Sequence, residues 1–192
     1  MNVIARKFMA WLVLFAAMLC LPLMAEDKPE SGFYIQDGQV VQKDDVYVLN
    51  VQIDHIFSDA ALEALENGVP LVVDLHVQVR RNRAWIWEED IVDMHLMRQL
   101  RYLPLSSGYE VIDINSRSKR SFASKLAAIE ALGELSDYAV VATKQLEPGE
   151  EYRVELRSSL DIESLPVPLR PTAYMSSAWK LSSDWKEWLI KP

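Results

Sequence analysis

The chain has 192 residues with one cysteine and six glycines, and its acidic residues outnumber the basic ones to give a formal net charge of −8. An acidic chain without a basic run is poorly suited to bind nucleic acid or anionic lipid surfaces. Six glycines leave little material for a phosphate-binding loop, and no G-x-S-x-G or H-E-x-x-H motif is present. These observations exclude the commonest nucleotide and hydrolase signatures.

The first 25 residues follow the pattern of a secretory signal. Arg6 and Lys7 form a short basic start, residues 8–24 carry no charge, and Ala25 supplies a small residue before a polar stretch that begins at Glu26. We expect cleavage between Ala25 and Glu26. An uncleaved membrane anchor is the main alternative, although about 17 apolar residues are near the lower limit for a membrane span.

Removal of this segment would change the properties of the protein. It takes away two positive charges and no acids, so the formal charge would move from −8 to −10. Cys20 is the only cysteine and would leave as well, which excludes a disulfide or a thiolate nucleophile in the exported form. A lipoprotein that uses Cys20 would need a small residue before it, where Leu19 stands. No later stretch is long and apolar enough to predict a second membrane span.

Residues 26–32 are expected to be a flexible leader, and residues 33–192 a single domain that begins with strands. Residues 33–41 suggest a hairpin around Asp37-Gly38. Residues 46–57 alternate between apolar and polar side chains, as a half-buried strand does. Ser58 or Asp59 can cap a short helix that Asn67-Gly68 ends.

The clearest strand follows Pro70, because Leu71, Val73, Leu75, Val77 and Val79 alternate with polar residues. A two-residue turn at Asn82-Arg83 would lead to a long strand over residues 85–102, with a bulge or exposed edge at the acidic triplet 88–90. Residues 109–114 alternate again.

The second half of the chain predicts another helix, a hairpin and a C-terminal helical segment. The helix covers residues 121–132 and stops at Gly133. Strands over residues 138–146 and 152–160 would form a hairpin around the turn 147–150. The prolines between residues 165 and 171 favour an extended segment, and residues from about Asp184 predict a helix whose apolar face carries Leu181, Trp185, Trp188 and Leu189.

Seven or so strands with one apolar face each require a second layer. We therefore expect a mainly β protein: a two-layer antiparallel β-sandwich, immunoglobulin-like, with two short helical crossovers and the C-terminal helical segment. A single antiparallel sheet covered by the two helices is the alternative.

Histidines next to acids are the candidate chemical groups. The pairs Asp74–His76 and Asp93–His95 each share a strand face, an arrangement that a metal could use. With the two-residue turn, His76 would face Glu89. Exposed Asp, His and Glu on a strand are ordinarily solvated residues, so no metal, cofactor or catalytic residue is expected. His55 falls in the apolar register and is expected to be a partly buried structural residue.

Tryptophans offer a binding hypothesis instead. Trp85 and Trp87 share a strand face, and Trp179, Trp185 and Trp188 in the C-terminal segment are the candidate contacts for a partner. The alternative is that the C-terminal tryptophans fold back onto the protein's own core.

Several segments together resemble one family. They include Leu62-x-x-Leu65-x-x-Gly68-Val-Pro-Leu71, Arg157-x-x-Leu160-Asp161-x-x-x-Leu165-Pro-x-Pro-Leu169 and Trp179-x-Leu-Ser-Ser183. On these residues the chain resembles the DUF4390 family of exported proteobacterial proteins. The resemblance implies a Gram-negative envelope location and a link to a membrane sensor histidine kinase, and it transfers no catalytic residue.

The function expected from these observations is that of a non-catalytic interaction or accessory module in the periplasm, with an envelope or inner-membrane protein as its partner. Two alternatives stay open. One is a metal- or carboxylate-dependent envelope enzyme that uses a cluster such as Asp74, His76 and Glu89. The other is a carrier of a small apolar ligand within the sandwich.

Overall fold

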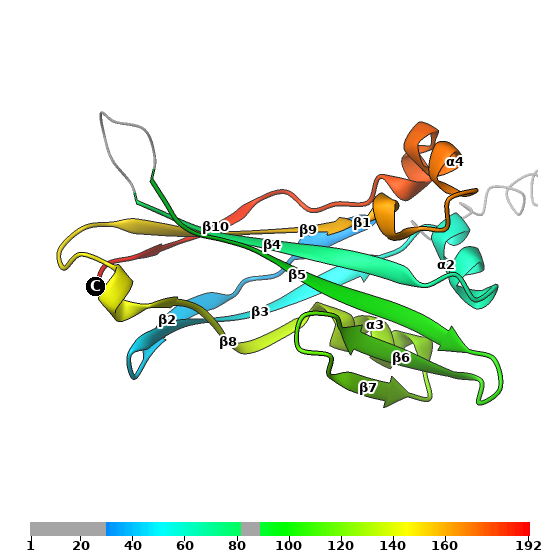
Figure 1. Cartoon of the computed structure of the whole chain (residues 1–192), viewed down its shortest axis with the longest axis horizontal. Helices are drawn as coiled ribbons and strands as arrows, with labels where there is room; N and C mark the ends of the chain where they lie inside the picture. The colour runs from blue at the N-terminus through cyan, green and yellow to red at the C-terminus, as the bar shows by residue number, and fades with distance from the viewer. Residues whose placement is uncertain (1–29, 82–88) are drawn as a thin grey trace, which may run out of the picture.

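Antiparallel strands in two sheets dominate the computed structural model, which describes residues 30–81 and 89–192 (Figure 1). The predicted signal segment with its cleavage site, most of the leader, and Trp85 and Trp87 lie outside the described residues. The mainly β, two-sheet architecture is confirmed. Among the helices of the described part, none is long and apolar enough to cross a membrane.

The first sheet is built on β3 (Val46–Ile56). On one side of it lies β8 (Glu134–Ala142), and the other side is shared end to end by β1 (Gly32–Ile35) and β2 (Gln39–Lys43). The predicted hairpin over residues 33–41 is therefore wrong, because both strands pair with β3 and not with each other. Gly38 permits this path, since a Cβ there would lie 2.7 Å from the Asn50 carbonyl oxygen.

The second sheet has six strands in the order β10-β9-β4-β5-β6-β7. Their bounds are Lys186–Ile190 for β10, Tyr152–Leu160 for β9, Leu71–Arg81 for β4, Glu89–Leu103 for β5, Gly108–Asp113 for β6 and Lys119–Phe122 for β7. The central strands β4 and β9 pair over nine positions, from Val73–Leu160 to Arg81–Tyr152. All neighbours in this sheet are antiparallel.

The two sheets bury their facing side chains in one core. The alternating apolar residues of β4, predicted to face one way, are fully buried: Leu71, Val73, Leu75, Val77 and Val79. They join β3 residues such as Leu49 and Ile53 in the same cluster. Full burial of a side chain of this size stabilises the fold by about 1.5–3 kcal/mol, so this alternation is the main determinant of the sandwich.

Both predicted crossover helices are present and connect one sheet to the other. Helix α2 (Asp59–Glu66) has the predicted cap, in which Ser58 Oγ accepts a hydrogen bond of 3.2 Å from the Ala61 amide. Helix α3 (Lys125–Gly133) begins later than predicted, after Ser124. Residues 119–122 form β7 beside β6, because pairing with the sheet outweighs the local helical spacing.

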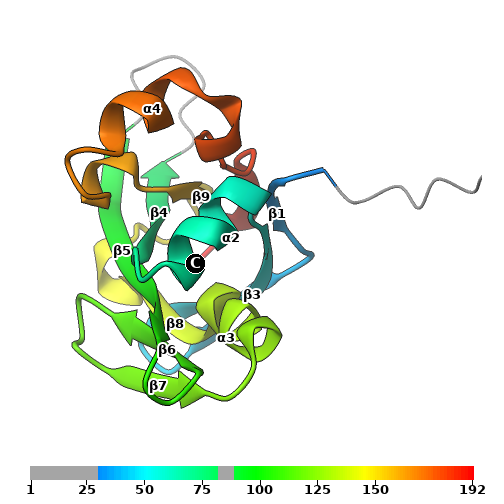
Figure 2. The ribbon, with the colours of Figure 1, turned by 90° about the vertical axis from the view of Figure 1, so that its right-hand side faces the viewer.

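Helix α3 runs directly into β8 at the predicted stop, Gly133 (Figure 2). A Cβ at Gly133 would lie 1.9 Å from the Ile53 carbonyl oxygen, so the backbone of this residue is pressed against β3. Glycine is required here for close approach rather than for an unusual backbone angle.

The predicted hairpin between residues 138–146 and 152–160 is wrong, although the strand at residues 152–160 is confirmed. Strand β8 pairs with β3 in the first sheet, whereas β9 pairs with β4 and β10 in the second. The turn at residues 147–150 does form, with the Glu150 amide donating to the Glu147 carbonyl. It lies after the 3-10 helix η1 (Thr143–Gln145) on a path from one sheet to the other.

The C-terminal region departs most from prediction. Residues 186–190 form the edge strand β10 and not a helix, because the free edge of β9 offers backbone pairing from Lys186–Leu156 to Ile190–Tyr152. The proline segment is only partly extended. It lies between η2 (Ile162–Ser164) and the short helix α4 (Arg170–Met175), where Pro171 occupies the first turn. The 3-10 helix η3 (Ser177–Trp179) follows.

Candidate functional site

Two aspartate–histidine pairs meet on the outer face of the six-stranded sheet. As predicted, Asp74 and His76 share a face of β4, and Asp93 and His95 share a face of β5. In the observed register His76 lies directly opposite His95. The predicted pairing of His76 with Glu89 is wrong, because Glu89 pairs with Arg81 in the observed register. The predicted turn at Asn82-Arg83 lies outside the described residues.

The pairs are joined diagonally across the two strands. His76 Nε2 lies 2.6 Å from Asp93 Oδ1, and His95 Nδ1 lies 2.8 Å from Asp74 Oδ2. The imidazole rings are stacked, with centroids 4.0 Å apart and planes 20° apart. The hydrogen bond with His76 holds the pKa of the Asp93 carboxyl below its usual value. The four groups thus form one compact polar cluster that solvent can reach.

Trp185 borders this cluster. Its ring centroid lies 5.2 Å from that of His76 in an edge-on arrangement, and 39% of the residue is exposed. The two other candidate contact residues serve the fold. Trp179 is buried, and Trp188 donates from Nε1 to the Gly38 carbonyl at 2.8 Å. The predicted helical face that carries both Trp185 and Trp188 is therefore wrong, because residues 186–190 form a strand in which Trp188 points to Gly38 while Trp185 borders His76.

A groove adjoins Trp185 between β1 and the segment before β10. Its volume is about 390 Å³, and its lining includes Phe33, Tyr34 and residues 182–186. One wall is a strand of the first sheet, and the other is the segment that leads into β10 of the second sheet. Among the described residues, one long backbone hydrogen bond joins the walls, from the Phe33 amide to the Ser182 carbonyl at 3.5 Å. Tyr34 and Trp185 are both exposed aromatic residues of this groove.

Ion pairs cover the rest of the outer face near β10. Arg80 pairs with Asp90 at 2.8 Å and with Glu155 at 3.4 Å, and Arg153 bridges Glu155 and Glu187. Glu155 is buried and lies between the partly exposed Arg80 and Arg153, whereas Asp90 and Glu187 are exposed. The outer pairs with Asp90 and Glu187 contribute little to stability. Together these pairs neutralise the arginine and carboxylate charges of the face next to the rings of Trp185 and His76.

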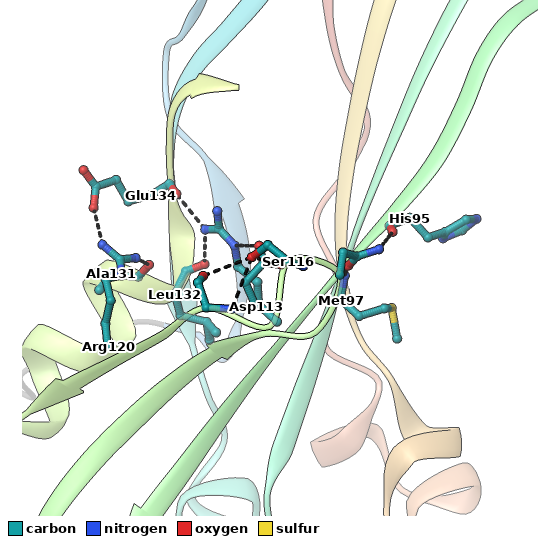
Figure 3. A network of polar contacts seen from close by, with 11 residues as sticks. His95, Met97, Asp113, Ser116, Arg120, Ala131, Leu132 and Glu134 are labelled. Carbon is teal, nitrogen blue, oxygen red and sulfur yellow. Dashed lines mark hydrogen bonds and ion pairs between the residues drawn. The ribbon is translucent and has the colours of Figure 1, made fainter. Parts of the chain in front are cut away.

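The turn between β6 and β7 supports β5 at His95. Asn115 accepts a hydrogen bond from the Met97 amide at 2.8 Å and donates to the His95 carbonyl at 3.1 Å. Figure 3 shows this region, with His95 and Met97 beside a second network around Asp113. The pairing of β5 with β6 ends at Arg98. Beyond that point, Asn115 takes the place of a strand neighbour and holds the β5 backbone at Met97 and His95.

The second network lies on the inner side of β5, where Arg98 faces the end of α3. Arg98 Nη1 donates to the carbonyls of Leu132 at 2.9 Å and Glu134 at 2.6 Å. Arg120 donates to the Ala131 carbonyl at 2.6 Å (Figure 3). Burial lowers the pKa of Arg98. Sequence reasoning missed this network, for which the only signal was a cation in the inward register between Leu96 and Leu100.

His55 is the third histidine and lies in the core. It is 4% exposed, its ring packs edge-on against Phe33 at 4.5 Å, and its Nε2 lies 3.0 Å from Ser158 Oγ. Burial, with a smaller effect of the Arg98 charge, lowers the pKa of His55 to about 3. The prediction of a structural residue in the apolar register is consistent with this position, and the burial is more complete than expected.

Comparison with known proteins places the chain in a family. The model of the domain of unknown function DUF4390 matches residues 30–189. The chain belongs to the DUF4390 family. This confirms the resemblance seen in the sequence, and the DUF4390 match includes both strands of the histidine cluster and Trp185. No curated protein and no solved structure matches the chain significantly.

Proposed function

We propose that this DUF4390 protein is exported, is cleaved between Ala25 and Glu26, and acts in the periplasm as a non-catalytic interaction module for an envelope or inner-membrane protein. The basic start, uncharged residues 8–24 and small residue at the cut support export. The family match begins at residue 30, which is consistent with a separate leader. Mass spectrometry of the protein from the periplasm should find Glu26 as its first residue, and a retained leader would contradict cleavage.

The observation that carries the interaction role is the exposure of Trp185 beside an aromatic-lined groove. Large apolar residues are normally buried, and a tryptophan that stays at the surface beside a cleft is typical of the residues that dominate protein interfaces. Leu189 of β10, four residues further along the chain, is 63% exposed. The surrounding ion pairs resemble the polar rim that surrounds an interface centre.

The groove favours a partner that inserts an extended segment. Its walls are β1, an edge strand of the first sheet, and residues 182–186, which lead into the edge strand β10 of the second, and no continuous backbone ladder joins them. An extended chain with apolar side chains could place them against Tyr34 and Trp185. A membrane sensor or an assembly factor with such a segment in the periplasm is the kind of partner that we propose.

Site-specific photo-crosslinking tests this role. A photoreactive residue at position 185 should capture one discrete partner in the periplasm, and Tyr34→Ser should reduce that capture without changing the amount of protein. The matched control is position 105 in the turn between β5 and β6, where Leu105 is fully exposed and does not line the groove beside Trp185. Equal capture from both positions, or no adduct from position 185 under any growth condition, would contradict the proposal.

A further inference from the structure

The histidine cluster has the composition of a metal site. His76, Asp93 and His95 each offer one ligand atom, and these atoms lie within 4.8 Å of one another. Two imidazole nitrogens and one carboxylate oxygen are the donor set of many zinc sites with an open coordination position. We infer that His76, Asp93 and His95 bind one borderline divalent transition-metal ion, with Zn²⁺ as the reference ligand, on the outer face of the six-stranded sheet.

The state of His95 favours this role. Its Nδ1 faces the Asp74 carboxylate at 2.8 Å, so Nδ1 acts as the donor, and in the neutral imidazole this tautomer leaves the lone pair on Nε2. Metal-binding histidines are usually held by such a carboxylate, which fixes the tautomer and strengthens the donor nitrogen. Asp74 is thus a positioning residue. His95 is 53% exposed, so its Nε2 can receive an ion from solvent.

His76 and Asp93 already form the other half of the site. His76 Nε2 and Asp93 Oδ1 are 2.6 Å apart. A bound cation would replace the proton between them, and that proton would leave to solvent. Donor atoms around a tetrahedral zinc ion at about 2 Å are about 3.4 Å apart. The spacing of His76 Nε2 and Asp93 Oδ1 must therefore widen by about 0.8 Å, and the widest spacing in the cluster, at most 4.8 Å, must close by up to about 1.4 Å. Rotation of the exposed Asp93 and His95 side chains can provide both changes.

The backbone beneath the site is rigid. His76 and His95 are direct neighbours in a ladder that runs from Leu71 to Arg81, and Asn115 holds β5 from its other side at the His95 carbonyl. The Trp185 indole packs against His76 with the ring centroids 5.2 Å apart and covers one side of the imidazole. Three protein ligands leave a fourth position of a tetrahedral ion open for water or another donor.

Metal titration of the purified chain tests the inference. After chelator treatment, calorimetry should detect one Zn²⁺ ion per chain, and Co²⁺ in its place should give the visible absorption of a tetrahedral nitrogen–oxygen site. His95→Gln and Asp93→Asn should each weaken binding at least 10-fold and remove the Co²⁺ bands. Asp74→Asn should weaken it about 10-fold to 100-fold, as loss of a supporting carboxylate does.

The matched control is Asp90→Asn, which removes a carboxylate of β5 that pairs with Arg80 outside the cluster. This variant should bind Zn²⁺ as the unchanged chain does, and circular dichroism should show that all variants are folded. Absence of saturable binding in the unchanged chain would overturn the inference. So would binding that survives both His76→Gln and His95→Gln, or binding that Asp90→Asn weakens as much as Asp93→Asn.

Discussion

The inner and outer faces of the six-stranded sheet differ although the same strands supply both. On the inner face, β4 places five fully buried aliphatic side chains against the other sheet. On the outer face, the alternate residues Asp74 and His76 form diagonal pairs with groups of β5. The inner face carries the packing energy, because apolar burial is the dominant stabilising contribution. The outer face is therefore free to carry exposed functional groups at little cost to stability.

The largest effect is expected at Gly133, where the inner layer is tightest. Gly133→Ala should lower the free energy of unfolding by about 3 kcal/mol or more, because the new methyl group overlaps the Ile53 carbonyl and forces α3 away from β3. Urea denaturation measures the change. Gly149→Ala is the control: Gly149 has a φ of 85° with nothing near its Cβ position, so it should cost only about 1–2 kcal/mol. Equal losses would contradict the close contact.

Arg98 is the next most sensitive position of the inner layer. Arg98→Leu should destabilise the chain by about 1–3 kcal/mol, because it removes the donor to the part-buried Leu132 carbonyl and to the more exposed Glu134 carbonyl. The control is Arg157→Leu, which removes an exposed cation from the outer face beside His76 and should change stability by about 0.5 kcal/mol or less. Thermal unfolding of both variants measures the two losses of stability. Equal melting temperatures for Arg98→Leu and Arg157→Leu would contradict a stabilising role of the Arg98 network.

The buried His55 should make the stability of the fold depend on pH. Its pKa is about 3 in the folded chain and near 6.5 when unfolded, so below pH 6.5 the unfolded state takes up a proton that the folded state does not. The contribution of neutral His55 to the free energy of unfolding is therefore complete above pH 6.5. It is lost as the pH falls toward 3, by up to about 1.4 kcal/mol per pH unit.

Denaturation curves from pH 7 to pH 4 check this contribution. His55→Gln should reduce the slope of stability against pH, whereas Ser158→Ala, which keeps the imidazole, should retain that slope at a lower overall stability. An unchanged slope in His55→Gln would show that other groups control the acid sensitivity.

The smallest effects are expected on the outer face. Trp185→Ser and Leu189→Ser should each change the free energy of unfolding by about 1 kcal/mol or less, since both side chains are substantially exposed. Calorimetric melting of both variants measures this. A loss comparable to that of Gly133→Ala would show that these residues stabilise the fold, and the contrast between the two faces would no longer hold.

The sequence by itself determined the features that depend on neighbouring residues. The period-two pattern of β4, the Ser58 cap of α2 and the stop at Gly133 were all readable, because side-chain alternation, capping and glycine contacts act locally. The aspartate–histidine pairs were also readable as residues of one strand face. The two-sheet architecture followed from the number of strands with a single apolar face.

Only the tertiary structure decided how distant segments meet. It joined β10 to the free edge of β9, sent β8 and β9 to different sheets, and set His76 opposite His95 instead of Glu89. Each choice depends on backbone hydrogen bonds and burial between segments far apart in the chain, which no local pattern contains. The stacked histidines and the exposed Trp185 beside them are products of that long-range pairing.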